Sequence, residues 1–362
     1  MTKNRIQILK EKMLSQPRYV SIEQALIITK TYKQHENEPI ILKRAYALAN
    51  ALRELEIGIE NEELIVGNRT KGVRYGVVFP ESGISWVDRE FETISTRKQD
   101  KFLVRDEDIK IFREQIVPYW KGKSLEDVIK QNFGKEISAI NKVVKINQTD
   151  HAQGHICPNV EKWLQKGVSG LLEDAQNHYK NADEDKKNFY QAIIIVMKAV
   201  QNFMLRYHDL LIATAKDDEK NRASLIKVAD ICKNISQRPP QTFHEAVQAT
   251  WFLFVILHME SNASSFSPGR LDKILYPYYI KDIENNILTK DEALEIIECL
   301  WLKFNEIVYL RNQHSAKYFA GFPIGFNIAV GGVDEQGNDF SNDLSELFLS
   351  AQEDLGLSQP NL

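Results

Sequence analysis

Residues 238–279, RPPQTFHEAVQATWFLFVILHMESNASSFSPGRLDKILYPYY, decide the fold that this sequence predicts. Thr242 and Glu245 have the spacing of a capping box, which marks the start of a helix. The apolar residues behind this cap leave no polar stripe, and a helix that is apolar nearly all round lies inside a protein or a membrane. The apolar run is too short and too closely flanked by charges to span a bilayer. We therefore expect a helix enclosed by protein on every side, which ends in the small polar loop 261–265.

The composition of the 362 residues is ordinary for a globular protein, with 43% hydrophobic and 27% charged residues. The length suffices for two average domains or one large one. A net charge of -4 gives no electrostatic reason to expect nucleic acid or a membrane as a partner. The three cysteines are few, odd in number and widely spaced, which argues against a disulfide framework or a zinc site. Such cysteine usage suits a reducing compartment, so we expect a cytoplasmic protein.

Outward from the central stretch, most of the chain has helical periodicity. Apolar faces and capping signals predict helices at about residues 5–15, 21–35, 39–52, 106–120, 160–233, 289–308 and 342–354. Two short segments, 62–67 and 326–330, have the character of strands. We find no internal repeat, no low-complexity tract and no linker, which predicts one helix-dominated α/β unit over residues 1–362.

The last residues, 357–362, form an extended piece that ends on an apolar leucine. The backbone groups and the leucine side chain of such a piece require partners. We therefore expect more chain to follow.

Several segments, taken together and in order, carry a resemblance to a known family. Besides 238–279 they are 63–67 (ELIVG), 78–81 (VFPE), 154–155 (GH), 327–332 (NIAVGG) and 359–362 (QPNL). The chain resembles the glycyl radical enzymes related to pyruvate formate-lyase. It is most similar to the branch of glycerol and diol dehydratases, choline lyase, hydroxyproline dehydratase and arylacetate decarboxylases. One segment alone would be a weak match, whereas the ordered set is specific.

The resemblance implies a ten-stranded barrel of two antiparallel half-barrels wrapped in helices, of which this chain would form one half-barrel and its surrounding helices. In the family, a separate radical S-adenosylmethionine activase installs a glycyl radical, which oxidises a cysteine to a thiyl that abstracts a substrate hydrogen. The cysteine loop and the glycine radical domain come later in the family sequences. We therefore expect residues 1–362 to be truncated before the cysteine loop, with no catalytic residue and no cofactor of their own.

The resemblance also assigns four substrate-binding candidates to this chain: His155, Asn159, Ser264 and Ser265. His155 matches a histidine that contacts substrate hydroxyls, although a histidine satisfied by backbone carbonyls at a bend is the alternative. Asn159 stands where the diol dehydratases have aspartate, and Ser264 stands where they have histidine, whereas Ser265 keeps their serine. Both departures argue against glycerol or propanediol as the substrate. The alternative role for the two serine hydroxyls is to cap the carbonyls at the end of the central helix.

The three cysteines are expected to be structural. The match gives Cys157 no reactive role, because the family's reactive cysteine comes later. Cys232 and Cys299 lie in helical patterns beside apolar residues, where cysteine usually acts as a small buried hydrophobe.

Four further polar residues of the central stretch have a structural explanation. His244 and His258 are expected to be core histidines with one hydrogen-bond partner each. Arg270 and Asp272 are expected to form a structural ion pair. No histidine or carboxylate pair has the spacing of metal ligands, so we expect no metal site.

The function that follows is the N-terminal portion of a glycyl radical lyase or dehydratase of anaerobic metabolism. The complete enzyme would cleave a C–O, C–N, C–S or C–C bond of a small hydroxylated or carboxylated metabolite. Its partners would be the substrate, the activase and a second copy in a homodimer. This portion alone would be inactive. The alternatives are a non-catalytic fragment or split-enzyme subunit that acts as a binding partner, and pyruvate formate-lyase (formate C-acetyltransferase) itself.

Overall fold

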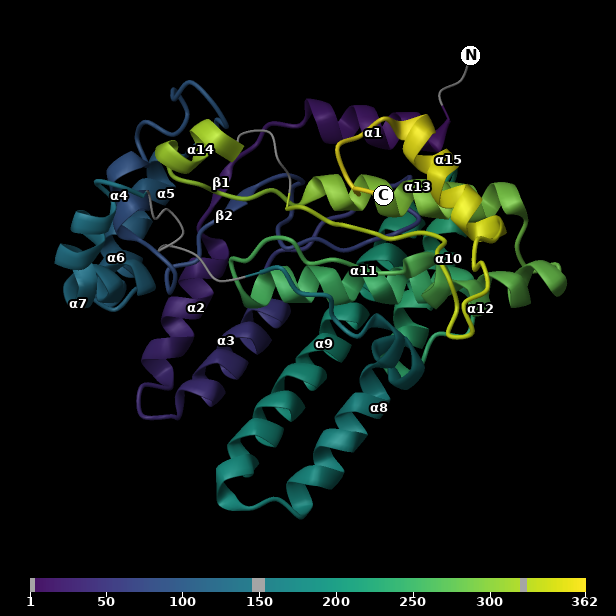
Figure 1. Cartoon of the computed structure of the whole chain (residues 1–362), viewed down its shortest axis with the longest axis horizontal. Coiled ribbons are helices and arrows are strands. Elements are labelled where there is room, and N and C mark those ends of the chain that lie inside the picture. The colour runs from purple at the N-terminus through teal and green to yellow at the C-terminus, as the bar shows by residue number, and fades with distance from the viewer. Residues whose placement is uncertain (1–3, 145–153, 320–323) are drawn as a thin grey trace.

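The computed structural model describes residues 4–144, 154–319 and 324–362. Helices form most of the molecule, and Figure 1 shows the hairpins α2–α3 and α8–α9 projecting from a body built around α11. The helices of the first half are α1 (Arg5–Ser15), α2 (Glu23–Gln34), α3 (Ile40–Glu54), α4 (Ser85–Glu90), α5 (Asp106–Ile111), the π-helical turn Phe112–Ile116, α6 (Val117–Trp120), α7 (Leu125–Ile140) and α8 (Val160–Lys180).

The second half is helical as well. It contains α9 (Glu184–Asp217), α10 (Arg222–Gln237), α11 (Phe243–Glu260), α12 (Leu271–Glu284), α13 (Lys290–Glu306), α14 (Gln313–Phe319) and α15 (Asp343–Leu355). The two short strands β1 (Val20–Ser21) and β2 (Gly76–Val77) pair in parallel. The helix-dominated fold that the sequence predicts is therefore confirmed.

Helix α11 lies in the core, as the sequence predicts. Thr242 caps it by accepting a hydrogen bond from the backbone N–H of Glu245 at 3.3 Å. Trp251 and Phe254 are fully buried, and α3, α8, α10, α12 and α13 all pack against the helix. Four residues near its C-terminal end, Leu253, Ile256, Leu257 and Glu260, border an open hollow that residues of α3, α8 and α9 complete. Within the described ranges, no helix combines the length and the hydropathy needed to cross a membrane.

The expectation that α11 has no polar stripe is wrong. His244, Gln248 and Trp251 follow one another at one-turn spacing and therefore share a face of the helix. All three are buried, and their side-chain nitrogens lie 2.7, 2.7 and 2.8 Å from the backbone carbonyl oxygens of Leu64, Val66 and Gly67, respectively. Burial lowers the pKa of His244 to about 4, so its imidazole is neutral and donates from Nε2.

This stripe explains why the predicted strand at 62–67 is also wrong. The segment is buried from Glu63 onward, but its backbone turns and bends, and it pairs with no strand of the described residues. Its backbone bonds to side chains instead: the Oε1 of Gln248 accepts from the Val66 N–H at 2.8 Å, and the Nε2 of the same residue donates to the Val66 carbonyl. Buried backbone polar groups must be paired, and here a helix supplies the partners that a β-ladder usually supplies.

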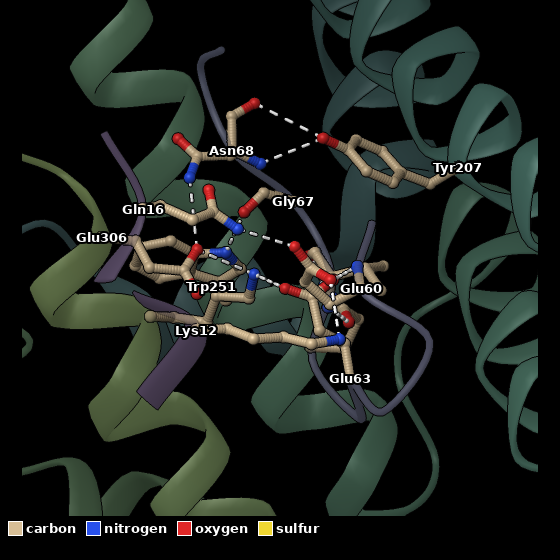
Figure 2. Close-up of polar contacts among 12 residues, drawn as sticks. Lys12, Gln16, Glu60, Glu63, Gly67, Asn68, Tyr207, Trp251 and Glu306 are labelled. Carbon is tan, nitrogen blue, oxygen red and sulfur yellow. Dashed lines mark hydrogen bonds and ion pairs between the residues drawn. The ribbon is translucent and has the colours of Figure 1, made fainter. Parts of the chain in front are cut away.

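A buried charge cluster contacts residues 63 and 68 of this part of the chain (Figure 2). Lys303 of α13 forms ion pairs with Glu63 and, at 2.9 Å, with Glu306, and all three side chains are at most 7% exposed. Asn68 donates to Glu306 at 3.2 Å, and its backbone N–H donates to the Tyr207 hydroxyl at 3.0 Å. Two carboxylates thus share one ammonium, and burial raises the pKa of Glu306 to about 7. Residues 63–69, here called the buried segment, are anchored by polar contacts along their length.

A second backbone arrangement consists of four non-helical segments, 154–156, 264–269, 324–329 and 359–361, here called the ladder. Three isolated bridges join neighbouring segments, and all three are parallel: Ile156 with Phe266, Gly269 with Ile328, and Asn327 with Asn361. Helices connect these segments along the chain, as parallel pairing requires. Such an arrangement suits one half of a barrel, and it confirms extended structure near the predicted strand 326–330.

Candidate substrate site

The ladder brings His155 and Ser264 together. The backbone N–H of His155 donates to the carbonyl of Ser264 at 3.0 Å. A Cβ atom on Gly154 would lie 1.5 Å from the same carbonyl oxygen, so only glycine allows the two segments to approach this closely. Two candidates that lie more than a hundred residues apart in the sequence are therefore neighbours in the fold.

His155 and Ser265 both have left-handed backbone conformations, each with a φ of 61°. A residue with a side chain rarely adopts this region, and the strain costs on the order of 1–3 kcal/mol. The surrounding backbone holds Ser265 in place, because its N–H donates to Ile324 at 2.9 Å and a Cβ on Gly325 would lie 3.2 Å from its hydroxyl oxygen. Strained residues concentrate at ligand sites, and two of the four candidates are strained.

The serine hydroxyls do not cap α11. A helix leaves its last carbonyls without partners inside the helix, and these must be satisfied by other groups. Other side chains occupy those of α11: Arg69 donates to His258, Gln24 to Met259 and Arg44 to Glu260, at 3.4, 2.9 and 3.3 Å. The capping alternative for Ser264 and Ser265 is therefore wrong, and neither half-buried side chain forms a hydrogen bond among the described residues.

His155 is an exposed residue of the ladder. Within the described residues its imidazole accepts or donates no hydrogen bond, so the alternative of a histidine satisfied by backbone carbonyls gains no support. The neutral or protonated ring can donate a hydrogen bond to a substrate oxygen. His151, which the sequence places nearby, lies outside the described residues.

Asn159 has a structural role at the start of α8. Its Oδ1 accepts from the backbone N–H of Lys162 at 2.8 Å, which makes it the N-cap. Aspartate and asparagine are about equally good caps, so capping does not explain which of the two stands here. The amide nitrogen of this exposed residue is free to donate, and its prediction as a substrate contact stays a prediction.

The cysteines lie where the sequence suggests. Cys232 and Cys299 are buried, and burial raises the pKa of the Cys299 thiol to about 12. Cys157 is exposed and packs against the ladder, because a Cβ on Gly269 would lie 2.9 Å from its sulfur. His258 is a core histidine whose Nδ1 lies 2.7 Å from the carbonyl of Phe254, as expected.

Arg270 and Asp272 do not form the expected ion pair. The carboxylate of Asp272 accepts from the Gly331 N–H at 2.7 Å and from the Ser345 hydroxyl at 2.6 Å. The guanidinium of Arg270 donates to the carbonyls of Gly331 and Val333. Both residues are structural, but they do not pair with each other. Each one instead forms hydrogen bonds to the turn that follows the third ladder segment.

One pair of polar residues on the ladder escaped the sequence interpretation. The side-chain amide of Asn361 donates to the Oδ1 of Asn327 at 2.9 Å, and both residues are exposed. The only sequence signal was that both fall in segments that match the family. Among the described residues, no group of three or more histidine, cysteine or acidic side chains could hold a metal ion.

Comparisons with known proteins agree with this architecture. The model of the pyruvate formate lyase-like family matches residues 1–362. The "Probable dehydratase YbiW" of Escherichia coli K12 is 34% identical over 95% of this chain and 44% of its own length. The (2S)-3-sulfopropanediol dehydratase of Klebsiella oxytoca is 30% identical over 98% of this chain and 45% of its length.

A solved structure gives the same result. The glycerol-bound, B12-independent glycerol dehydratase of Clostridium butyricum superposes with a TM-score of 0.93 at 33% identity, over 99% of this chain and 48% of its own. The chain thus spans less than half the length of the relatives that it matches.

Proposed function

Since this chain belongs to the pyruvate formate lyase-like family, we propose that it is the N-terminal portion of a glycyl radical dehydratase or lyase. The substrate class is a small hydroxylated or carboxylated metabolite. The relatives named above support this class, because two of them are dehydratases of substituted propanediols or glycerol. The radical glycine and the reactive cysteine belong to the part of such an enzyme that follows these residues, and they supply the hydrogen abstraction.

One observation carries the proposal: the ladder places His155, Ser264 and Ser265 side by side, with two of them held in strained conformations. The role of this chain is to bind and orient. The imidazole and the Ser265 hydroxyl would donate hydrogen bonds to a substrate oxygen and fix the carbon that loses hydrogen. Holding a reactant in one geometry is worth several powers of ten in rate, and rigid supports make it possible.

The identity of residue 264 restricts the range of substrates that we propose. The diol dehydratases that this chain resembles have a histidine where this chain has Ser264. A serine hydroxyl, unlike an imidazole, does not titrate near neutral pH. Ser264 can orient an oxygen or a carboxylate but cannot transfer a proton in place of histidine. The proposal therefore favours a substrate other than glycerol or 1,2-propanediol. It also includes a separate activase as a partner, assembly of the enzyme as a homodimer and a cytoplasmic location.

The test starts with the DNA downstream of codon 362. The proposal expects a continuous reading frame that encodes a cysteine loop and a glycine loop. The longer protein, treated with its radical S-adenosylmethionine activase under anoxia, should give a glycyl radical signal in electron paramagnetic resonance. It should then convert at least one member of a panel of hydroxylated and carboxylated metabolites.

Two outcomes would contradict the proposal. Turnover by the 362-residue chain alone after the same treatment would show that the missing loops are not needed. A stop codon directly after codon 362 would favour the alternative, in which the chain is a split-enzyme subunit that binds a partner.

A further inference from the structure

Backbone strain concentrates in a second place besides the candidate substrate site. Five residues other than glycine have positive φ within the described ranges, and two of them, Arg74 (60°) and Asp100 (52°), line one cavity. Arg18, Asn305, Tyr309 and Ser358 also line it, and none of these residues belongs to the candidate substrate site. The volume of the cavity is about 90 Å³. This is room for a small ion or molecule and more than one water needs.

The cavity contains more positive than negative charge. Its one lining carboxylate, Asp100, accepts from the Nη2 of Arg18 at 2.7 Å and lies 3.5 Å from the Nη2 of Arg97. Asp100 is therefore already shared between two guanidiniums. Within the described part of the chain, the guanidinium of Arg74 has no carboxylate within ion-pair distance.

One of the two lining arginines has a buried donor that the described residues leave unused. The Nε of Arg18 is buried and has no hydrogen-bond partner among the described residues. Burial lowers the pKa of Arg74, the nearby charge of Arg18 lowers it further, and the charge of Asp100 opposes this change. An unpaired buried donor costs free energy, and so does an uncompensated buried charge.

The neutral polar groups of the lining are already engaged. The Nδ2 of Asn305 donates to the carbonyls of Trp301 and Gln359, both at 2.8 Å, and the Tyr309 hydroxyl donates to the carbonyl of Asn262. The Ser358 hydroxyl donates to the Oδ1 of Asn305 at 3.4 Å, and the remaining lining residues are aliphatic or methionine. Apolar walls strengthen any interaction between an enclosed anion and the guanidiniums.

We propose that this cavity binds a small-molecule oxyanion, a carboxylate, sulfonate or phosphate group, through the guanidiniums of Arg18 and Arg74. Guanidinium is the side-chain group best matched to such ligands, because its planar fork donates two parallel hydrogen bonds to their oxygens. A bound anion would compensate the excess positive charge of the cavity lining. The small volume favours a free ion or a compact metabolite over a polypeptide segment. The inference does not depend on the proposed function.

The experiment is an isothermal titration of inorganic phosphate into the purified chain at low ionic strength. We expect saturable binding of one phosphate per chain that weakens as sodium chloride is added. Arg74→Gln should weaken it at least about tenfold, the loss that one charge-assisted hydrogen bond represents. Arg74→Gly should weaken binding equally while keeping the left-handed backbone without strain. Arg53→Gln, which alters an exposed arginine of α3, should leave the affinity unchanged.

A fourth variant should change the affinity in the opposite direction. Asp100→Asn removes the carboxylate that competes with the ligand for Arg18, and asparagine tolerates positive φ well, so phosphate should bind more tightly. Thermal unfolding of every variant checks that the fold is retained. Absence of saturable phosphate binding to the wild type would overturn the inference, as would equal affinities of the wild type and both Arg74 variants. If the cavity instead accepts an acidic side chain of another polypeptide, phosphate should not bind saturably, and the inference would be overturned.

Discussion

The buried segment and the ladder solve the same problem in opposite ways. Both are non-helical backbone inside a helical protein, and within the described residues neither pairs along its length as in a regular sheet. The buried segment bonds to side chains of α11 and α13, and its polar groups are enclosed. The ladder bonds backbone to backbone, and within the described residues the side chains of His155, Ser264 and Ser265 form no hydrogen bond. The difference separates residues that stabilise the molecule from residues that are available to a ligand.

The largest expected effect comes from the charge cluster of the buried segment. Lys303→Met leaves two buried carboxylates without a cation, and loss of one partner from a buried ion pair costs about 3–5 kcal/mol. Chemical denaturation should show a fall of that size in the free energy of unfolding. Lys290→Met is the matched control on α13, because Lys290 pairs with Asp343 at the surface, where such pairs contribute at most about 1 kcal/mol. Equal effects of the two substitutions would refute the role assigned to the cluster.

The next effect concerns the polar stripe of α11. Gln248→Leu removes both partners of Val66, and each orphaned backbone group costs roughly 1–3 kcal/mol. We expect a loss of about 2–4 kcal/mol in the free energy of unfolding. Gln165→Leu, on the exposed face of α8, should change it by less than about 0.5 kcal/mol. If the buried segment did not need the Gln248 side chain, both substitutions would leave the free energy of unfolding almost unchanged, which would contradict this account.

These two predictions also show what the sequence could and could not reveal. The cap at Thr242 and the burial of Trp251 followed from local pattern, because a helix carries its own periodicity. The pairing of Gln248 with Val66 did not, since the partners lie 182 residues apart and a polar residue in an apolar run gives no sign of its acceptor. The false strand at 62–67 has the same cause. Its apolar composition is typical of a buried strand, but composition does not reveal which groups form hydrogen bonds with its backbone.

The candidate site was predicted only through family resemblance. No periodicity or spacing connects His155 with Ser264 and Ser265, and the parallel register that joins them depends on helical crossovers of about a hundred residues. The resemblance supplied the grouping, and the ladder shows that the three residues are neighbours. The cationic cavity had no comparable signal, because Arg18, Arg74 and Asp100 occur in unrelated segments.

The charge cluster should also make stability depend on pH. The pKa of Glu306 is raised to about 7 in the folded state, above its ordinary value of 4.5, so the folded protein binds the extra proton. The stability that this proton contributes is complete below about pH 4.5 and is lost as the pH rises through about 7. Glu306→Gln should therefore gain stability relative to wild type, by about 1–2 kcal/mol between pH 5 and pH 7.5. Urea unfolding at several pH values measures the difference, and a difference that does not change with pH would contradict the raised pKa of Glu306.

The smallest effect is expected on the ladder. His155→Gly relieves a left-handed backbone while losing an exposed side chain, so the free energy of unfolding should change by less than about 1 kcal/mol. Asn286→Gly is the matched control, because Asn286 has a similar φ of 54° in an exposed turn after α12. Both variants should behave alike in denaturation. A loss of several kcal/mol in His155→Gly alone would mean that the histidine belongs to the stabilising framework.

The central claim is that His155 and Ser265 contact one substrate from adjoining segments of the ladder. A double-mutant cycle of kcat/KM, with His155→Ala, Ser265→Ala and both together in the activated longer enzyme, tests it most directly. Two groups that orient the same molecule should be coupled by at least about 0.5 kcal/mol, with each single variant losing activity. Losses that simply add, or single variants as active as the wild type, would contradict the account.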